Sequence, residues 1–332
     1  MTSSSGPQSL LQIKNLKTYF FTHQGVVKAV DDLSFNLDKG RVLGLVGESG
    51  SGKSMTSLSI LRLVPPPGKV VSGEILFENK PLLKLNDESM RRLRGKEISM
   101  IFQEPMTSLN PVFTVGEQVA EMLRVHLKMT RKDARERTYE LFKLVGIPSE
   151  QKRFKEYPHQ LSGGMRQRVM IAMAISCNPK LILADEPTTA LDVTIQAQIL
   201  NLLHDLRNRF NMAMVLVSHD LGIIAESADE VAVMYAGKII EFAETKKLFS
   251  NPLHPYTQGL LDSLPRFDEN GDKRSRLKAI PGVVPQLSDL PAGCAFEPRC
   301  SFAMPICKSL FPPLEEKEKD HWSSCHLKGT HS

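Results

Sequence analysis

The sequence predicts an α/β fold built around a parallel β-sheet. Over about the first 260 residues, strand-like apolar runs alternate with helix-like segments, as they do in layered α/β domains. Ligands bind beyond the carboxyl ends of parallel strands, so strands that end at chemically active residues predict one shared site. Four short apolar runs have the character of buried parallel strands and lead to such residues: Val42–Val46, Ile98–Phe102, Leu181–Ala184 and Met214–Val217.

The first of these strands leads directly into a glycine-rich loop that fits the pattern Gly-x-x-x-x-Gly-Lys-[Ser/Thr]. A helix-compatible segment, Met55–Leu63, follows the loop. The backbone N–H groups of such a loop and the N-terminus of the following helix bind phosphate oxygens. The pattern therefore predicts a P-loop NTPase (RecA-like) core, with an ordinary Gly/Ser loop as the alternative. The eight residues are Gly47, Glu48, Ser49, Gly50, Ser51, Gly52, Lys53 and Ser54.

Four side chains in these regions are of the types that nucleotide hydrolysis requires. Lys53 is expected to reach the β- and γ-phosphates, and the Ser54 hydroxyl to ligate Mg²⁺. Asp185, at the end of the third strand, is expected to hold Mg²⁺ through water. Glu186 follows it and is expected to orient or deprotonate the attacking water. A strand that ends in an acidic turn is the alternative, which the upstream phosphate-binding loop disfavours.

A second glycine motif precedes a helical pattern near the middle of the chain. Ser162, Gly163 and Gly164 lie in the segment Leu161–Arg168, and two glycines at a helix N-terminus predict a second anion-binding site. Ser162 also suits a simple helix N-cap, which is the structural alternative.

Two further segments depart from the α/β pattern. Between Pro105 and about Pro158, Val115–Lys128 and Arg131–Val145 are amphipathic, which predicts a helical insertion into the core. Asp268–Arg274 is polar and predicts a linker, after which the chain is rich in Pro and Cys and has little periodicity.

The bulk composition excludes several classes of protein. With 41% hydrophobic residues the chain has enough apolar surface for a core, and a net charge of +5 without a dense basic stripe argues against nucleic-acid binding. No apolar run is long enough to span a bilayer, and no signal peptide is visible, so a cytosolic protein is expected. Any role at a membrane would then come through partner subunits.

Together these motifs resemble the nucleotide-binding subunit of an ABC transporter, and the resemblance covers nearly the whole chain. It implies an ABC ATPase core at residues 1–260, with an inserted α-helical subdomain at about 105–168, and a small irregular Cys-rich C-terminal domain at 261–332. The motifs that carry it occur in the family's order: the P-loop, Gln103, the signature motif Leu161–Arg168, Asp185-Glu186, Ala190-Leu191-Asp192 and His219.

The resemblance implies roles for particular residues in a head-to-tail dimer that closes around two ATP molecules. Ser162, Gly163 and Gly164 would contact the ATP held by the partner's P-loop, although Met165 stands where the family prefers Gln. Gln103 would sense Mg²⁺ and the attacking water, His219 would contact the γ-phosphate, and Asp192 would act across the dimer interface. Phe20 is the best match for the aromatic residue that stacks on adenine, with Tyr19 and Phe21 as alternatives.

Further segments resemble the oligopeptide/dipeptide importer subfamily, which also contains nickel importers: Glu104–Pro111, Asn251–Leu261 and Ile280–Gly282. The resemblance implies an ATPase that drives uptake of dipeptides or oligopeptides; the alternatives are a nickel or other small-solute importer and a non-transport ABC ATPase. The implied partners are a second ATPase subunit, expected to be a paralogue, two transmembrane permease subunits and, indirectly, a peptide-binding protein. The implied location is the cytoplasmic face of the inner membrane.

Four cysteines near the C-terminus, Cys294, Cys300, Cys307 and Cys325, suit either a [4Fe–4S] cluster or Zn²⁺. The close Cys-x₂₋₄-Cys pairs of structural zinc sites are absent, and subfamily members with this tail pattern resemble iron–sulfur proteins, which favours a cluster with a structural role; unliganded thiols are the third alternative. His321 and His326 are candidate substitute ligands, with exposed surface positions expected instead. Cys177 is expected to be a small buried hydrophobic residue.

Overall fold

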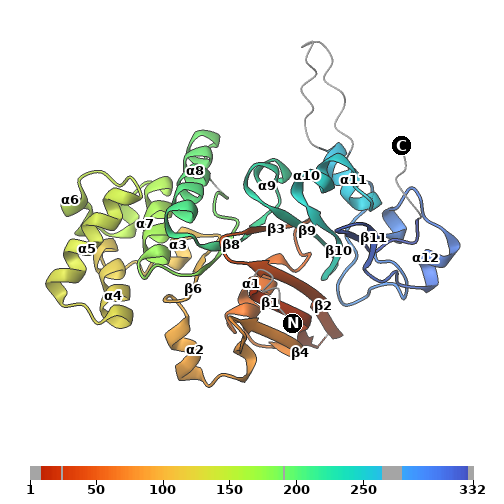
Figure 1. Ribbon diagram of the computed structural model, residues 1–332, viewed down its shortest axis with the longest axis horizontal. Helices are drawn as coiled ribbons and strands as arrows, with labels where there is room; N and C mark the ends of the chain where they lie inside the picture. The colour runs from red at the N-terminus through yellow and green to blue at the C-terminus, as the bar shows by residue number, and fades with distance from the viewer. Residues whose placement is uncertain (1–8, 24, 190, 264–278, 328–332) are drawn as a thin grey trace, which may run out of the picture. The chain divides into compact units, whose positions relative to one another are not determined.

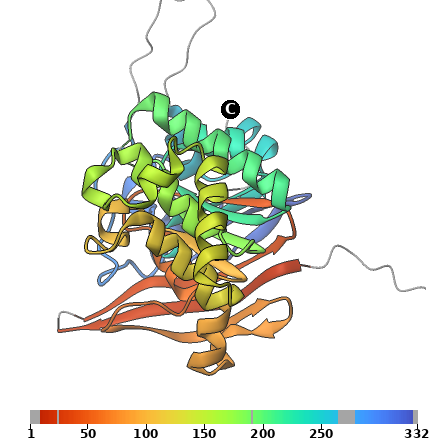
Figure 2. The same ribbon diagram turned by 90° about the vertical axis from the view of Figure 1, so that its left-hand side faces the viewer.

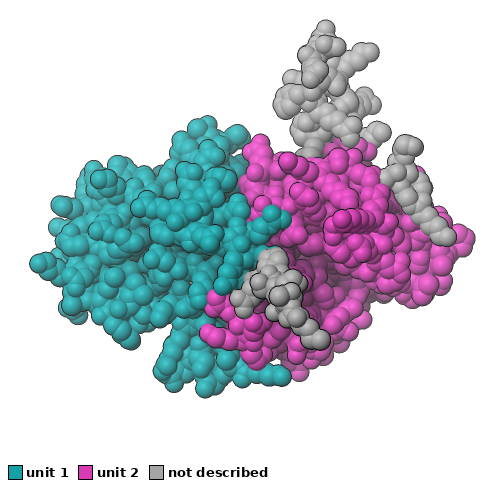
Figure 3. Space-filling view, in the orientation of Figure 1, with its two compact units in different colours: residues 1–10, 38–41, 84–217 teal, residues 11–37, 42–83, 218–332 magenta. Residues whose placement is uncertain are grey.

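The computed structural model describes residues 9–23, 25–189, 191–263 and 279–327 (Figure 1, Figure 2). Backbone contacts divide the chain into two compact units (Figure 3). Unit 1 contains residues 1–10, 38–41 and 84–217, and unit 2 contains residues 11–37, 42–83 and 218–332. No helix in the described ranges combines the length and the apolar character that crossing a bilayer requires.

Unit 1 contains three buried parallel strands, in the order β8–β7–β6. They are β6 (Ile98–Ile101), β7 (Leu181–Asp185) and β8 (Ala213–Ser218), with Ile98 opposite Leu181 and Leu181 opposite Ala213. All three strands predicted in this part of the sequence are thereby confirmed to within about one residue at each end. Continuous runs of apolar side chains form such strands because both faces of a parallel sheet are covered.

Helices make up most of the rest of unit 1. Four of them form the yellow-to-green bundle of Figures 1 and 2, in which α4 and α5 contact each other and each contacts both α6 and α7. The two amphipathic segments are confirmed as α4 and α5, which bury Val119, Leu123, Leu141 and Phe142. The helices of the unit are α2 (Asp87–Leu93), α3 (Pro105–Ser108), α4 (Val115–Leu127), α5 (Arg131–Leu144), α6 (Glu150–Phe154), α7 (Gly163–Ile175) and α8 (Val193–Phe210), with a 3₁₀ turn at Pro158–Gln160.

Unit 2 contains a four-stranded sheet near the start of the chain, in the order β2–β1–β4–β5. Strand β1 pairs antiparallel with β4, and β4 pairs antiparallel with β5. The strands are β1 (Ser9–Thr22), β2 (Gly25–Asp38), β4 (Gly68–Phe77) and β5 (Lys80–Pro81).

A second set of strands in unit 2 joins the strand before the P-loop to the C-terminal tail, in the order β3–β9–β10–β12–β11. Strands β3 and β9 are parallel, and the remaining pairs are antiparallel. The tail was expected to have little regular structure, but two of its segments extend this sheet. The strands are β3 (Val42–Val46), β9 (Glu230–Tyr235), β10 (Lys238–Glu244), β11 (Glu315–Glu318) and β12 (His321–Ser323).

The helices of unit 2 are short. The helix expected after the P-loop is confirmed as α1 (Lys53–Ile60). The others are α9 (Leu221–Ser227), α10 (Thr245–Ser250), α11 (Pro255–Asp262) and α12 (Pro305–Ser309), with 3₁₀ turns at Leu82–Lys84 and Glu297–Arg299. The predicted polar linker, Asp268–Arg274, lies outside the described residues.

Candidate functional site

The P-loop connects the end of β3 to the start of α1, and its glycines are required by the geometry. Gly47 has φ 152° and Gly52 has φ 102°. A Cβ atom on Gly47 would lie 2.2 Å from the Met234 carbonyl oxygen, and one on Gly52 would lie 2.2 Å from the Ala29 carbonyl oxygen. Only glycine combines these backbone angles with so close an approach to neighbouring main chain.

Lys53 is the first residue of α1, and its side chain is turned toward the loop that precedes it. Its ammonium group donates hydrogen bonds to the carbonyl oxygens of Gly47 (2.7 Å) and Glu48 (3.0 Å), and the residue is 5% exposed. Ser54 follows it in the first helical turn. A buried cation beside a helix N-terminus creates the positive potential that a phosphate group requires.

In unit 1, the ends of two neighbouring strands bring Gln103 and Glu186 together. The Gln103 side-chain amide donates a 3.0 Å hydrogen bond to the Glu186 carboxylate, and the Thr189 hydroxyl donates another of 2.8 Å. Glu186 follows the buried Asp185 and has φ 45°, while its own N–H bonds to the Val217 carbonyl oxygen. A non-glycine residue in this backbone region costs energy and is concentrated at functional sites.

The signature motif forms the start of α7. Ser162 caps the helix, since its hydroxyl accepts a 3.3 Å hydrogen bond from the Met165 N–H. Gly163 and Gly164 are the first two helical residues, and a Cβ on Gly164 would lie 2.8 Å from a methyl carbon of Ile195. The N-cap role that the sequence left open for Ser162 is therefore present, beside two glycine N–H groups at a helix N-terminus.

Two other predicted residues lie at helix starts. Asp192 caps α8, where its carboxylate accepts a 2.9 Å hydrogen bond from the Ile195 N–H. Ala190, which belongs to the same sequence motif as Asp192, lies outside the described residues. His219 is exposed between β8 and α9, next to Asp220, which caps α9. The carboxylate of Asp192 thus has a local structural role in addition to any role across an interface.

The candidate adenine-stacking residue lies on β1 opposite Gly68 of β4. The Phe20 ring is half-buried and covers Gly68 so closely that a Cβ there would lie 2.6 Å from it. Of the two alternatives, Tyr19 donates a hydrogen bond to Asp31, whereas Phe21 is 45% exposed. Phe20 therefore keeps a partly exposed ring, and its role in stacking stays a prediction.

The four tail cysteines are free thiols that line one small cavity, together with Phe296, Phe302 and His326. Burial raises the pKa of Cys294 to about 11 and also raises the pKa values of Cys300 and Cys325. In the part of the chain that the structure describes, no three His, Cys, Asp or Glu side chains are placed to hold a metal ion. Any group held here would have to displace protons from the thiols, because thiolates are the ligating form.

The expectation that His321 is exposed is wrong, because β12 places it in the sheet beside β10. His321 is 0% exposed, and its Nε2 lies 2.7 Å from the carboxylate of Glu241, which is also fully buried. His326 is half-buried, with its Nε2 2.9 Å from the Leu310 carbonyl oxygen. Cys177 is buried at the end of α7, as predicted.

Sequence patterns do not identify Arg299, whose side chain contacts the P-loop. Arg299, in the tail, forms an ion pair with Glu48, the second residue of the P-loop. No local pattern marks Arg299, since it lies in an irregular segment 251 positions away in sequence. In the sequence, Arg299 differs from the other arginines only in its position next to Cys300.

Two protein-family models match this chain, one in its N-terminal part and one in its C-terminal part. Residues 30–189 match the family model described as ABC transporter, and residues 240–307 match the oligopeptide/dipeptide transporter C-terminal region. The chain is 53% identical over 320 residues to the oligopeptide transport ATP-binding protein AppD of Bacillus subtilis (strain 168), covering 96% of this chain and 97% of that protein. The chain belongs to the ABC transporter ATP-binding protein family. The same organism's dipeptide transport ATP-binding protein DppD is 50% identical to it over 321 residues, covering 96% of this chain and 95% of that protein.

Solved structures confirm the ATPase cassette fold of this ABC protein. The ATP-binding cassette MJ0796, solved as a dimer in a post-hydrolysis state bound to ADP and Pi, superposes with a TM-score of 0.64 at 28% identity. That alignment covers 71% of this chain and 98% of the solved one. CbiO1 from Clostridium perfringens, part of the ABC transporter complex cbiONQ, gives a TM-score of 0.62 at 27% identity over 73% of this chain and 91% of its own.

Proposed function

We propose that this chain is the ATP-binding and ATP-hydrolysing subunit of a membrane importer for dipeptides or oligopeptides. The observation that carries the hydrolytic part is Glu186, whose carboxylate accepts hydrogen bonds from Gln103 and Thr189 directly after the buried Asp185. The substrate class rests on relatives named as oligopeptide and dipeptide transport proteins and on the matching C-terminal region.

In this proposal each P-loop and strand-end residue has a defined role. The N–H groups of Gly47–Ser54 and the Lys53 ammonium bind the β- and γ-phosphates. Ser54, Asp185 and Gln103 are of the oxygen-donor types that hold Mg²⁺, which neutralises phosphate charge when bound. Glu186 orients or deprotonates the attacking water, and His219 contacts the γ-phosphate. Phosphoryl transfer needs positioning and charge compensation more than covalent chemistry, and these residues are of the types that supply both.

The second ATP-contacting surface belongs to another subunit. Ser162, Gly163 and Gly164 serve the ATP of the partner, with Asp192 acting across the interface. The MJ0796 cassette, solved as a dimer, supports this arrangement. We further propose that the partner is a paralogue and that the pair sits on two permease subunits at the cytoplasmic face of the inner membrane, with a peptide-binding protein delivering the cargo.

The proposed domain division keeps the boundary at residue 260 that the sequence predicts, although the second family match begins at residue 240. Residues 1–260 form the nucleotide-binding domain, with the helical subdomain at about 105–168, and residues 261–332 form a C-terminal Cys-rich domain. The helices α3 to α7 support the subdomain, and the second match at residues 240–307 supports a distinct C-terminal region.

A [4Fe–4S] cluster remains the proposed occupant of the four-cysteine cavity. Four free thiols around one cavity are the ligand type that such a cluster takes. Among the described residues no three His, Cys, Asp or Glu side chains are placed to hold a metal ion, so the proposal rests on the ligand type and on the shared cavity alone. Anaerobic purification with iron, sulfide and absorption assays tests this, and stoichiometric zinc without iron would overturn it.

Transport assays separate the candidate substrates. The chain is reconstituted in vesicles with its permease subunits and binding protein, and ATP-dependent uptake of a peptide panel and of Ni²⁺ is measured. Peptide uptake that disappears with Glu186→Gln is expected. Uptake of Ni²⁺ alone would favour the nickel importer, and failure to co-purify with membrane subunits would favour a non-transport ATPase.

A further inference from the structure

The P-loop residue Glu48 is held by a side chain from the C-terminal tail. Arg299 donates two hydrogen bonds to its carboxylate, Nη1 to Oε2 at 2.6 Å and Nη2 to Oε1 at 2.9 Å. The Arg299 side chain is 4% exposed, and that of Glu48 is 29% exposed. A bidentate pair between a guanidinium and a carboxylate fixes direction as well as distance, which a single point charge does not.

Arg299 is itself fixed by contacts that do not involve Glu48. Its Nε donates a 3.0 Å hydrogen bond to the Pro281 carbonyl oxygen, and its Nη1 lies 3.3 Å from the Tyr235 hydroxyl. The guanidinium carbon lies 5.9 Å from the ring centres of both Tyr235 and Phe296. These contacts orient the guanidinium before it meets the P-loop, so little side-chain entropy is lost on pairing.

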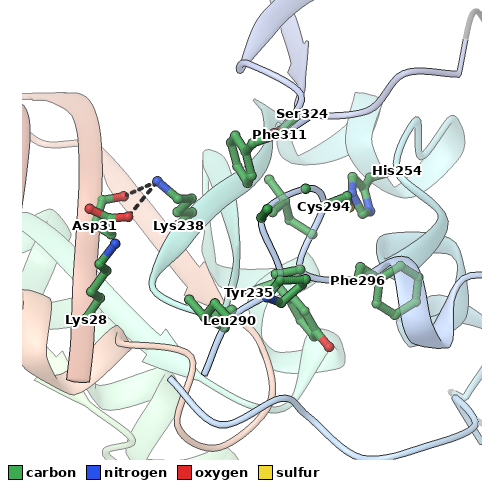
Figure 4. Close-up of a pocket in the computed structure, with 16 residues that line it drawn as sticks. Lys28, Asp31, Tyr235, Lys238, His254, Leu290, Cys294, Phe296, Phe311 and Ser324 are labelled. Atoms are coloured by element: carbon green, nitrogen blue, oxygen red, sulfur yellow. Dashed lines mark hydrogen bonds and ion pairs between the residues drawn. The ribbon is translucent and has the colours of Figure 1, made fainter. Parts of the chain in front are cut away.

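The main chain of Glu48 is bound by the same part of the molecule. Its N–H donates a 2.8 Å hydrogen bond to the Tyr256 hydroxyl. The Tyr256 ring packs against Tyr235 at 4.7 Å and against Phe296 at 5.4 Å between centroids. Tyr235 of β9, Phe296 of the tail and His254, the residue before α11, line a cavity of about 390 Å³. Figure 4 shows these three side chains.

On its other side, Glu48 meets the P-loop lysine. The Glu48 carbonyl oxygen accepts the 3.0 Å hydrogen bond from Lys53. Glu48 is therefore bound through its carboxylate, its N–H and its carbonyl oxygen, and the first two of these contacts come from residues outside the P-loop. Arg299 contacts Glu48, and Glu48 contacts Lys53, which is expected to bind phosphate. A substitution at Arg299 can therefore reach the phosphate-binding groups through Glu48 alone.

We propose that Arg299 is a positioning residue for the nucleotide site, which holds Glu48 and so keeps the P-loop in its phosphate-binding conformation. The inference rests on the proposed role of the P-loop in binding ATP. It also gives the tail a role in that site, because the 3₁₀ turn that carries Arg299 begins after Cys294, whose N–H bonds to the Cys307 carbonyl oxygen at 2.8 Å. The cysteine segment then orders an ATP site that the family's core motifs alone do not complete.

The test compares Arg299→Met with the wild type in the full-length protein assembled with its partner subunits. Affinity for MgATP is measured with a fluorescent ATP analogue, and KM and kcat with a phosphate-release assay. We expect Kd and KM to rise about tenfold, equivalent to about 1.4 kcal/mol, with kcat changed less than about threefold. Arg299→Lys keeps the charge but loses the bidentate geometry, so its Kd and KM are expected to lie between those of the wild type and Arg299→Met. This variant keeps the inference testable if Arg299→Met does not fold.

A matched control variant and a double mutant test whether Arg299 acts on the nucleotide site through Glu48. Arg92→Met removes an arginine from the exposed ion pair with Glu88 in α2 and is expected to leave all three constants unchanged. Glu48→Gln is expected to weaken MgATP binding to a similar degree. Combining it with Arg299→Met should add less than about twofold, because both changes break the same contact.

Three outcomes would count against the inference. Unchanged Kd in Arg299→Met, with normal binding by the wild type, overturns it and leaves the proposed function intact. A fall in folded fraction and kcat with KM unchanged also overturns it, because that result describes a purely structural residue. Absence of MgATP binding by the wild-type assembly contradicts the proposed function itself, and this inference with it.

Discussion

The side-chain amide of Gln103 donates a 3.0 Å hydrogen bond to the carboxylate of Glu186, although the two residues are 83 positions apart in the sequence. Gln103 lies two residues beyond β6 and Glu186 one residue beyond β7, and the two strands run parallel as neighbours. The amide therefore orients the carboxylate that is proposed to act on water.

Replacing Glu186 by Gln keeps the shape of the side chain and removes its negative charge. We expect the variant to bind ATP normally and to hydrolyse it at least about a hundredfold more slowly, because a positioned general base contributes about that much or more. Phosphate release measures the rate and a fluorescent nucleotide the affinity. Near-normal turnover would remove Glu186 from this role.

Replacing Lys53 by Ala removes the cation that lies against the P-loop carbonyl oxygens. The affinity for MgATP is expected to fall at least about tenfold, since charge-assisted hydrogen bonds contribute roughly 1.5–3 kcal/mol. Equilibrium binding of a fluorescent ATP analogue measures it. Lys80→Ala, at an exposed position of β5, is the control and should bind as the wild type does.

Glu241 is expected to be the most sensitive position for stability among the tail contacts. Its fully buried carboxylate lies 2.7 Å from His321 Nε2 and accepts hydrogen bonds from the N–H groups of Leu253 and His254. Glu241→Ala leaves these partners buried without an acceptor and should cost about 3–5 kcal/mol in urea unfolding. Glu315→Ala, which breaks an exposed pair with Lys317, is the control; equal loss in both variants would refute the argument.

His254 is expected to make the fold sensitive to acid. Burial lowers the pKa of His254 from 6.5 to about 4, and its Nδ1 accepts the Tyr256 N–H, so the neutral ring is the folded form. The unfolded chain binds a proton more readily, so stability is fully present above pH 6.5 and falls as the pH drops toward 4.

Between about pH 7.5 and about pH 5 this one group should account for roughly 2 kcal/mol of lost stability. Urea unfolding of the wild type and of His254→Asn at both pH values measures it. The Asn variant keeps a side-chain acceptor for the helix start and should lose much less stability on acidification. The same pH dependence in both proteins would assign the effect to other groups.

Local sequence patterns predicted the elements that position the candidate site. The apolar runs that form β3, β6, β7 and β8 are recognisable because strands buried on both faces are rich in apolar residues. The glycines of the P-loop were recognisable because Gly47 and Gly52 take backbone angles, beside close main chain, that other residues do not tolerate.

The errors and omissions concern contacts between distant segments. The sequence predicts an exposed His321, but β12 joins the sheet edge at β10 and buries this side chain beside Glu241. No sequence pattern marks Arg299, because nothing in an irregular segment distinguishes an arginine that pairs with the P-loop from one that faces water.

The sequence by itself determined the order of the elements, the phosphate-binding loop and the acidic strand end, since each is encoded by the spacing of a few neighbouring residues. Only the tertiary structure decided that Gln103 meets Glu186, that the tail extends the sheet beyond β10 by two strands, and that Arg299 holds Glu48. The reason is physical: spacing along the chain dictates local backbone conformation, whereas pairing across 83 or 251 residues depends on how whole sheets and turns pack.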